Sequence, residues 1–328
     1  MNQEPGKTFV AILRILADAR VPMGARRIAE ALVNYGIELT ERTVRYHLKI
    51  MDERGLTEGH DTSGRTISDK GLRELENALV VDKVGLVITR IDTLCYRTTF
   101  DLDRLKGDVI LNVSSFPEQD FGRALEAMAP VFRKGFSMGQ LVAVARGGET
   151  LAGVEVEPGE VAFGTVCSVT ANAVLFKSGI PVASEFGGLL EIADGEPLRF
   201  TDLVTYAGSS LDPLEIFIKG RMTSVGSAAR TGRGKIGAGF RTMPAAARQQ
   251  VVETLERLRG ARLCGLAVVG KPGRAVAEID VAAQRVGMAI AGGLNPLAAA
   301  EEDGIPTKNW AMSTVCDFAD LVPFDDLL

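Results

Sequence analysis

Histidine is scarce in this chain of 328 residues, and both histidines lie near its start. His47 and His60 leave the whole stretch from Asp61 to Leu328 without an imidazole. Serine or cysteine nucleophiles activated by histidine, and metal sites with histidine ligands, are therefore excluded from that stretch. Carboxylate or lysine chemistry stays open, but no spacing singles it out. We expect no catalytic residue, no metal and no cofactor.

Cysteine pairs and long apolar runs are also missing. No apolar run is long enough to span a bilayer, and the N-terminus lacks the basic-then-apolar layout of a signal peptide. A hydrophobic content of 46% and a net charge of -5 are typical of a soluble protein with room for two or three domains. We expect no membrane contact, a cytoplasmic location and reduced thiols. The four cysteines form no CxxC pair, which argues against disulfides and zinc: Cys95, Cys167, Cys264 and Cys316.

The segment from Glu41 to Leu56 has the pattern of a DNA-recognition helix. Helical spacing gives it an apolar stripe of three residues: Val44, Leu48 and Met51. Another side presents four residues that can reach phosphates and base edges: Arg42, Arg45, Tyr46 and Lys49. Thr40 is placed to cap the N-terminus, and Gly55 stands where a helix commonly ends in a left-handed residue. The pattern predicts a helix from about Glu41 to about Arg54.

Further elements around this helix predict a winged helix-turn-helix domain over residues 1–68. Two shorter helices precede it, separated by the VPMG turn at residues 21–24. A small β-wing follows, with strands at 56–58 and 66–68 and with His60 and Arg65 near its tip. The alternative is a small packed helical domain with a solvated charged face. The order, the spacing and the wing together favour DNA binding.

Charge placement suggests how such a domain would bind DNA. Positive and negative side chains nearly balance between Met1 and Ser68, so affinity must come from local placement and a single copy would bind weakly. We therefore expect a homodimer on a palindromic double-stranded operator. Six residues are expected to contact it, the first five in the major groove and the last on the flanking backbone: Arg42, Thr43, Arg45, Tyr46, Lys49 and Arg65.

After the wing, the sequence pattern indicates a connecting helix and then a second domain. Ser68 can cap a connecting helix over residues 69–79, and the run VGLVIT at 84–89 reads as a strand. We place the boundary near Val81, with residues 69–83 as linker and residues 84–328 as a second domain. The connecting helix would pack either on its twin in a dimer or within its own chain.

The second domain contains an internal sequence repeat. The stretch GDVILNVSSFPEQDFGRALEAM from Gly107 matches GKIGAGFRTMPAAARQQVVETL from Gly234, and each leads to an apolar strand. Later, GIPVASEFGG from residue 179 echoes GMAIAGG from residue 287, and FTDLVTY from residue 200 echoes FADLVPF from residue 318. These matches predict a mixed α/β fold of two half-units, about 84–206 and 213–328. Convergent patterning without duplication would give much the same architecture, with a cleft at the junction.

The first candidate ligand site is GTVCSVTAN, residues 164–172. Its hydroxyls, thiol, amide and loop N–H groups could hold a carboxylate or a phosphate without histidine. The alternative is an alternating strand with half-buried small polar residues. The candidate residues are Thr165, Cys167, Ser168, Thr170 and Asn172.

Two further stretches could attract an anion. The glycine-rich segment 228–241 contains a weak GxGxxG match, and its Arg230 and Arg233 could bind an anion or belong to a solvated loop. Lys235 and Arg241 lie in the same segment. In AGGLNPLAAAEEDGIP, residues 291–306, Asn295 precedes an alanine-rich helix whose N-terminus could bind an anion, although a capping role alone is the simpler interpretation.

These motifs together resemble the NrpR-type transcriptional repressors of nitrogen assimilation. The resemblance rests on RTVRYHLKIMDERGLT and GRTISDKG in the first domain, and on GTVCSVTAN, SGIPVASEFGG, SLDPLEIFIKGRMTSV and AGGLNPLAAAEEDGIP in the second. It implies a repressor of nitrogen-fixation and ammonium-assimilation genes that 2-oxoglutarate, a small dicarboxylate effector, releases from its operator. The chain departs from the family in having one effector domain where some members have two, and in Ala173, where we expect glycine.

Two rival hypotheses remain beside the repressor. One is an α/β enzyme that acts on a small anionic metabolite and carries a regulatory DNA-binding domain. The other is a large domain that only dimerises or recruits a partner protein. The missing histidines argue against the enzyme. An effector that prefers the non-binding arrangement would have to act on the spacing of two DNA-binding domains, because equal affinity for both arrangements shifts nothing.

Overall fold

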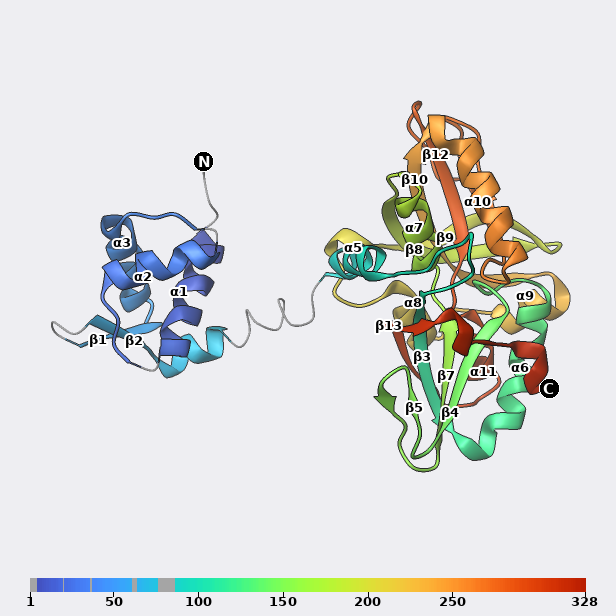
Figure 1. Ribbon diagram of the computed structural model, residues 1–328, viewed down its shortest axis with the longest axis horizontal. Coiled ribbons are helices and arrows are strands. Elements are labelled where there is room, and N and C mark those ends of the chain that lie inside the picture. The colour runs from blue at the N-terminus through green and yellow to red at the C-terminus, as the bar shows by residue number, and fades with distance from the viewer. Residues whose placement is uncertain (1–4, 20, 36, 61–63, 76–85) are drawn as a thin grey trace. The chain divides into compact units, whose positions relative to one another are not determined.

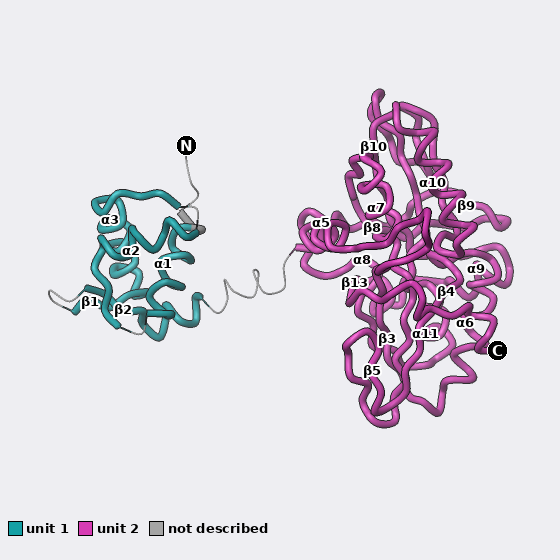
Figure 2. The backbone as a smooth tube through the Cα atoms, viewed as in Figure 1, with its two compact units in different colours: residues 1–85 teal, residues 86–328 magenta. Residues whose placement is uncertain are grey.

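The computed structural model of the chain divides into two compact units, residues 1–85 and 86–328, which we call the N-terminal and the C-terminal unit (Figure 2). It describes residues 5–19, 21–35, 37–60, 64–75 and 86–328. The expected domain boundary near residue 81 and the expected helical residues 76–79 lie outside these ranges.

The N-terminal unit is a three-helix core with a small β-hairpin, so the expected winged helix-turn-helix architecture is confirmed. Its elements are α1 (Pro5–Ala19), α2 (Ala25–Leu32), η1 (Val33–Tyr35), α3 (Glu41–Glu53), β1 (Thr57–His60), β2 (Gly64–Ile67) and a helix at 69–75. The apolar stripe expected for α3 is fully buried, and it packs on Ile12 of α1 and Ile28 of α2, which are fully buried as well. The helix therefore leaves its polar side to solvent.

Both predicted ends of α3 are confirmed by local geometry. The Thr40 hydroxyl accepts a hydrogen bond from the Thr43 amide at 3.2 Å, and Gly55 has a φ of 68°, the left-handed conformation that glycine adopts most easily. The wing strands are longer than expected, because β1 and β2 pair from Thr57 opposite Ile67 to His60 opposite Gly64.

The expected strand at residues 84–89 is wrong, because helix α5 (Val87–Arg97) begins inside it. Its run of β-branched residues suggested a strand, but the buried residues Val87, Ile91 and Cys95 recur every four positions. That spacing belongs to one face of a helix, and packing of this face outweighs the local preference for strand.

The C-terminal unit contains two copies of one order of elements. The first copy comprises β3 (Asp108–Pro117), η2 (Glu118–Asp120), α6 (Phe121–Arg133), β4 (Leu141–Arg146), the hairpin β5 (Thr150–Leu151) and β6 (Val154–Glu155), β7 (Glu160–Val166), α7 (Val169–Lys177), β8 (Ala183–Ala193), β9 (Glu196–Thr205) and η3 (Tyr206–Gly208). Two short helices, α8 (Pro213–Lys219) and α9 (Val225–Thr231), lead to the second. That copy comprises β10 (Gly234–Pro244), η4 (Ala245–Ala247), α10 (Arg248–Gly260), β11 (Ala267–Val269), β12 (Arg285–Ala291), α11 (Asn295–Glu302), β13 (Lys308–Asp317), η5 (Phe318–Asp320), β14 (Val322–Pro323) and η6 (Phe324–Leu327).

Each copy gives its last strands to the sheet of the other. The two antiparallel sheets have the orders β13-β3-β7-β4-β14 and β11-β12-β10-β8-β9, and Figure 1 shows them at opposite ends of the C-terminal unit. The sheet of β3, β4 and β7 is thus completed by β13 and β14, and the sheet of β10, β11 and β12 by β8 and β9. Neither copy can bury its sheet alone, so the junction between them is part of the core.

One of the four sequence matches within this unit is wrong. GIPVASEFGG, which contains β8, was matched with GMAIAGG, which belongs to β12, but β12 follows α10 and β11 as β7 follows α6 and β4. The strand equivalent to β8 is β13, which follows a second GIP at residues 304–306. Both stretches contain a pair of glycines, which produced the error, although Gly187 and Gly188 lie inside β8 whereas Gly292 and Gly293 follow the end of β12. Among the residues that the structure describes, no helix has both the length and the apolar character needed to cross a membrane.

Candidate functional site

The polar side of α3 presents the residues expected to contact DNA. Arg42, Arg45, Tyr46 and Lys49 are exposed, Tyr46 to 65%, and Thr43 is half-buried beside the N-terminal cap. The Tyr46 ring contacts His47 edge-on at 6.2 Å between centroids, and its exposed part lies among these cations. This face can supply phosphate contacts and base contacts together.

Two of the expected DNA contacts already have partners within the unit. Arg45 forms an ion pair with Glu41 one helical turn away, and its side chain is 70% exposed. Arg65 donates from Nε to Asp52 Oδ2 at 2.8 Å, and Thr57 donates to the other carboxylate oxygen at 2.6 Å. Asp52 therefore ties the wing to α3, and a DNA contact by Arg65 stays a prediction.

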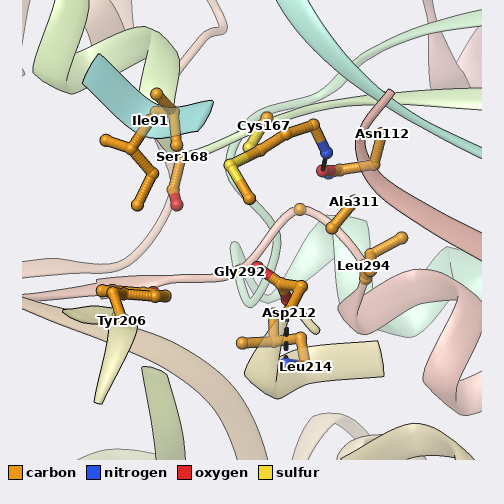
Figure 3. Close-up of a pocket in the computed structure, with 14 residues that line it drawn as sticks. Ile91, Asn112, Cys167, Ser168, Tyr206, Asp212, Leu214, Gly292, Leu294 and Ala311 are labelled. Atoms are coloured by element: carbon orange, nitrogen blue, oxygen red, sulfur yellow. Dashed lines mark hydrogen bonds between the residues drawn. The ribbon is translucent and has the colours of Figure 1, made fainter. Parts of the chain in front are cut away.

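The C-terminal unit has a pocket at the junction of its two copies. It is lined by two equivalent turns, one between β7 and α7 and one between β12 and α11, and by residues from β3, β10, β13, α5 and the segment before α8. Figure 3 shows Cys167 and Ser168 of the first turn across the pocket from Gly292 of the second. Helices α7 and α11 both begin at this pocket, and helix N-termini favour negative charge.

A buried arginine stands behind the first turn. Arg241 of β10 is 1% exposed; its Nε donates to Asn172 Oδ1, and one Nη donates to Ser168 Oγ at 2.9 Å. The other, Nη1, is buried without a hydrogen-bond partner, and no carboxylate of the described residues lies within ion-pair distance of it. A buried cation without a counter-charge is costly, so an anion beside Nη1 would be strongly favoured.

The unpartnered nitrogen lies next to the lining of the pocket. A Cβ atom added at Gly239, which lines the pocket, would sit 2.7 Å from Arg241 Nη1 and 3.1 Å from the Tyr206 hydroxyl. Glycine at this position therefore leaves the guanidinium and the phenol open to the same small space. Burial raises the pKa of Tyr206 well above its ordinary value, so its hydroxyl stays a hydrogen-bond donor.

An acidic side chain, Asp212, also lines the pocket. Burial, and then the charge of nearby Glu215, raise the pKa of Asp212 to about 6, and its Oδ1 caps α8 by accepting from the Leu214 amide at 2.9 Å. Burial likewise raises the pKa of the Cys167 thiol to about 12, which makes it a poor nucleophile. The pocket therefore offers a cationic end and an acid that is easily neutralised.

The family of the chain follows from a comparison with known proteins. A family model described as NrpR regulatory domains NRD1 and 2 matches residues 84–322, which is well over half of the chain. The chain belongs to the NrpR family. A model described as the ribonuclease R winged-helix domain matches residues 10–75 of this NrpR-family chain, in agreement with the N-terminal fold.

Similar proteins carry regulator names. The chain is 36% identical to the "Global nitrogen regulator NrpRI" of Methanosarcina mazei, with 97% of this chain and 98% of that protein covered. It is 32% identical to the "Global nitrogen regulator NrpR" of Methanococcus maripaludis, but spans only 54% of that protein. The crystal structure of a nitrogen repressor-like protein from Methanococcus jannaschii matches 73% of the chain and 99% of its own, with a TM-score of 0.61 and 26% identity.

Within this NrpR-family chain, the stretch 164–172 is a strand end, a turn and the first turn of α7, not an alternating strand. Cys167 and Ser168 line the pocket, and Asn172 holds Arg241 while donating to Ser184 at 2.9 Å. Thr165 contacts the lining only through Asn112, at 3.4 Å. The Thr170 hydroxyl bonds to the backbone of Ile110, which gives it a structural contact.

Three other expected effector residues lie elsewhere. Asn295 is buried, and its amide joins Gly237 of β10 to the carbonyl of Phe136, so all its polar atoms are used within the protein. Arg230 and Arg233 are exposed on and after α9, near Asp303 and Asp194 respectively, and neither lines the pocket. The segment expected as a glycine-rich loop is the end of α9 followed by a central strand, β10.

Sequence analysis of this family member missed two residues that line the pocket and the buried arginine next to it. Arg241 was noticed only as one of several cations in a presumed loop, and Tyr206 and Asp212 were not singled out. A weak signal existed, because an arginine inside the small and apolar run GAGF-R-TM is unusual for a buried strand. Which partners it meets depends on residues far away in the chain.

Proposed function

We propose that the protein is a DNA-binding transcriptional regulator that represses genes of nitrogen fixation and ammonium assimilation. The names of its relatives and the winged helix-turn-helix unit support this function, and relatives named as regulators favour it over an enzyme. The exposed side of α3 supplies the DNA contacts. Double-stranded operator DNA is the partner.

We further propose that the pocket between the two copies binds a small dicarboxylate, 2-oxoglutarate, as effector. The single observation that carries this is the buried Arg241 Nη1, which has no partner among the described residues and lies beside the pocket-lining Gly239. One carboxylate of the effector would take the place of the missing partner. Ser168, the Tyr206 hydroxyl and the N-terminus of α7 would complete its hydrogen bonds.

Because the pocket is small, binding of the effector requires a change of conformation. The space open to the centre of a water molecule is about 20 Å³, enough for one water and far too little for a five-carbon dicarboxylate. The effector must therefore select a more open arrangement of the same residues. Preference for one of two arrangements is what an allosteric effector needs.

Operator binding with and without 2-oxoglutarate tests both parts of the function. We expect the chain to bind promoter fragments of nitrogen-assimilation genes more tightly than unrelated DNA, and millimolar 2-oxoglutarate to weaken that binding in a fluorescence-anisotropy titration. Loss of the promoter preference would overturn the repressor. An unchanged operator affinity with ligand would overturn only the effector.

Arg241→Gln tests the assigned pocket. It should weaken 2-oxoglutarate binding, measured by calorimetry, about tenfold or more, because a charge-assisted hydrogen bond is lost. Arg230→Ala removes a cation outside the pocket and should change nothing. Tyr206→Phe removes one hydroxyl from the lining and covers the case in which the Arg241 variant does not fold. Equal ligand affinity in the wild type and both pocket variants would place the effector elsewhere.

We also propose that the operator-bound form is a homodimer. Acidic side chains of the N-terminal unit pair with two of the cations proposed to contact DNA, in the Arg45–Glu41 and Arg65–Asp52 pairs, so one copy offers fewer free positive charges to DNA. Two copies on a palindromic operator would add their contacts. Removing one half-site should therefore reduce affinity by orders of magnitude; an equal affinity for half-sites would contradict a dimer.

A further inference from the structure

Helix α5, the first helix of the C-terminal unit, forms part of the pocket wall. Ile91 lines the pocket, and Val87, Ile91 and Cys95 form one buried cluster with residues of the pocket wall, among them Cys167, Val169, Tyr206 and Met312. The Val87 amide also donates to the carbonyl of Ser209, just after η3, at 2.9 Å. The same helix follows residues 76–85, which join it to the DNA-binding unit in the chain.

A single arginine fastens α5 to the opposite wall of the pocket. Arg90 donates from Nη2 to the carbonyl of Ala311 at 2.8 Å and to that of Met312 at 3.3 Å, and both of these residues line the pocket. Glu215 of α8 accepts from the Ala311 amide on the other side. The segment 311–312 is therefore clamped between α5 and α8.

The clamped segment is an irregular part of an edge strand. The pairing of β13 with β3 shifts between Trp310 and Thr314, and Met312 inside this bulge has a φ of 50°, a conformation that side chains other than glycine rarely adopt. The Met312 amide donates to Asn112 Oδ1 at 3.1 Å, across the pocket lining. Such a bulge can change conformation without breaking a sheet, whereas the turns after β7 and β12 continue central strands.

We propose that α5 carries the effector signal out of the pocket, an inference that rests on the proposed effector function. Ligand larger than the present cavity pushes Ile91 and the Met312 bulge outward, which breaks the Arg90 bonds to residues 311 and 312. Helix α5 then shifts on η3 and α7, and the shift passes along the chain toward the DNA-binding unit. In this scheme Arg90 is a positioning residue, because it favours the closed arrangement without touching the ligand.

Arg90→Ala in the full chain tests this scheme, with Arg97→Ala as matched control. Arg97 lies on the same helix and is exposed, and its side chain forms no hydrogen bond or ion pair with the described residues. The measured quantity is the ratio of operator Kd with and without saturating 2-oxoglutarate. Arg90→Ala should bring this ratio at least about threefold closer to one, Arg90→Lys should give an intermediate value, and Arg97→Ala should equal the wild type.

Ligand binding alone separates coupling from recognition. Calorimetry without DNA should give an equal or tighter 2-oxoglutarate Kd for Arg90→Ala, because loss of the clamp favours the open arrangement. A lost ligand affinity would place Arg90 in the binding site and overturn the scheme. An unchanged operator ratio in Arg90→Ala, beside a responding wild type, overturns only the role of α5. A wild type that does not respond overturns the effector function as well.

Hydrogen exchange on the wild type keeps the test independent of whether the variants fold. With 2-oxoglutarate bound, the amides of residues 87–97 should exchange at least about threefold faster than without it, because α5 loses its anchor at residues 311–312. The amides of α10, which does not line the pocket, serve as internal control. Bound ligand with unchanged exchange in α5 would overturn the proposal.

Discussion

Arginines of the two units differ in what surrounds them. Arg45 on α3 is largely exposed and pairs with a glutamate one turn away, whereas Arg241 on β10 is 1% exposed and is held by an amide and a hydroxyl without any carboxylate. Water screens the first charge, so it adds little stability and can exchange its partner for a phosphate. The second charge cannot leave its partners, so it acts on whatever enters the pocket. The same side chain is therefore suited to one kind of contact by exposure and to another by burial.

The largest expected difference between the two arginines appears when the side chain that each one contacts is removed. Asn172→Ala leaves the buried Arg241 guanidinium with an unsatisfied Nε and should lower the free energy of unfolding by about 2–3 kcal/mol. Glu41→Ala should cost less than about 0.5 kcal/mol, because its ion pair is exposed and lies within one helix. The single tryptophan, Trp310, reports on the C-terminal unit during urea unfolding, and helical circular dichroism reports on the whole chain. Equal effects would contradict the distinction.

The acid in the pocket should show its burial as a pH dependence. Because the pKa of Asp212 is raised to about 6 from 3.8, the folded state binds the proton more tightly than the unfolded state. The stability this confers is fully present below the unfolded pKa and is lost as pH rises through the folded value. Asp212→Asn, which keeps the α8 cap, lacks this loss. Relative to the wild type it should gain up to about 3 kcal/mol between about pH 4 and pH 7.

That gain would be measured by urea unfolding of both proteins across the pH range. Glu41→Gln on the exposed α3 is the control, and its difference from the wild type should stay nearly flat. A flat difference for Asp212→Asn would show that the carboxyl is solvated, and the pocket would then be more open than its narrow cavity indicates.

The loss of stability on removing the Arg65 side chain should lie between the losses expected for Asn172→Ala and Glu41→Ala. Arg65 and Asp52 are each 31% exposed, so Arg65→Ala should lower the stability of the N-terminal unit by about 1 kcal/mol and loosen the wing. Arg42→Ala, on the exposed side of the same unit, should leave thermal stability unchanged. If both variants melt like the wild type, the Arg65–Asp52 pair does not hold the wing.

The smallest effect on stability is expected for Lys49, which we propose contacts DNA. Lys49→Ala should leave the unfolding midpoint unchanged, weaken operator binding about three- to tenfold and reduce the salt dependence of binding by about one ion. Arg73→Ala, exposed on the helix at 69–75, removes the same charge away from α3 and should not change the salt dependence. A loss of operator affinity without a change in salt dependence would mean that Lys49 contacts bases.

The extent of successful prediction differs between the units for a physical reason. The stripe of Val44, Leu48 and Met51, the cap at Thr40 and the left-handed Gly55 all concern residues within one or two helical turns, and each was confirmed. In the C-terminal unit the strand–helix repeat from Gly107 and Gly234 was visible for the same reason. The exchange of strands between the two copies was not visible in the sequence. Strand pairing joins residues far apart in the chain, and the residue pattern of one strand does not show which other strand it pairs with.

The prediction of site residues likewise succeeded for some residues and failed for others. Cys167 and Ser168 were found because they interrupt an apolar sequence, and the structure places both at the pocket. Arg230 and Arg233 were chosen for their charge alone, and both are exposed and do not line the pocket. Charge in a sequence shows that a residue can bind an anion, but burial decides which arginine lacks a partner.

The amino-acid sequence by itself determined the exposed polar face of α3, the repeated order of strands and helices and the family to which the chain belongs. These depend on periodicity, capping and motif identity, which neighbouring residues carry. Only the tertiary structure decided that α5 is a helix on the pocket wall, that the copies exchange strands, and that Arg241 meets Asn172 and Ser168. Those contacts join residues about seventy positions apart, and burial of a charge is a property of everything packed around it.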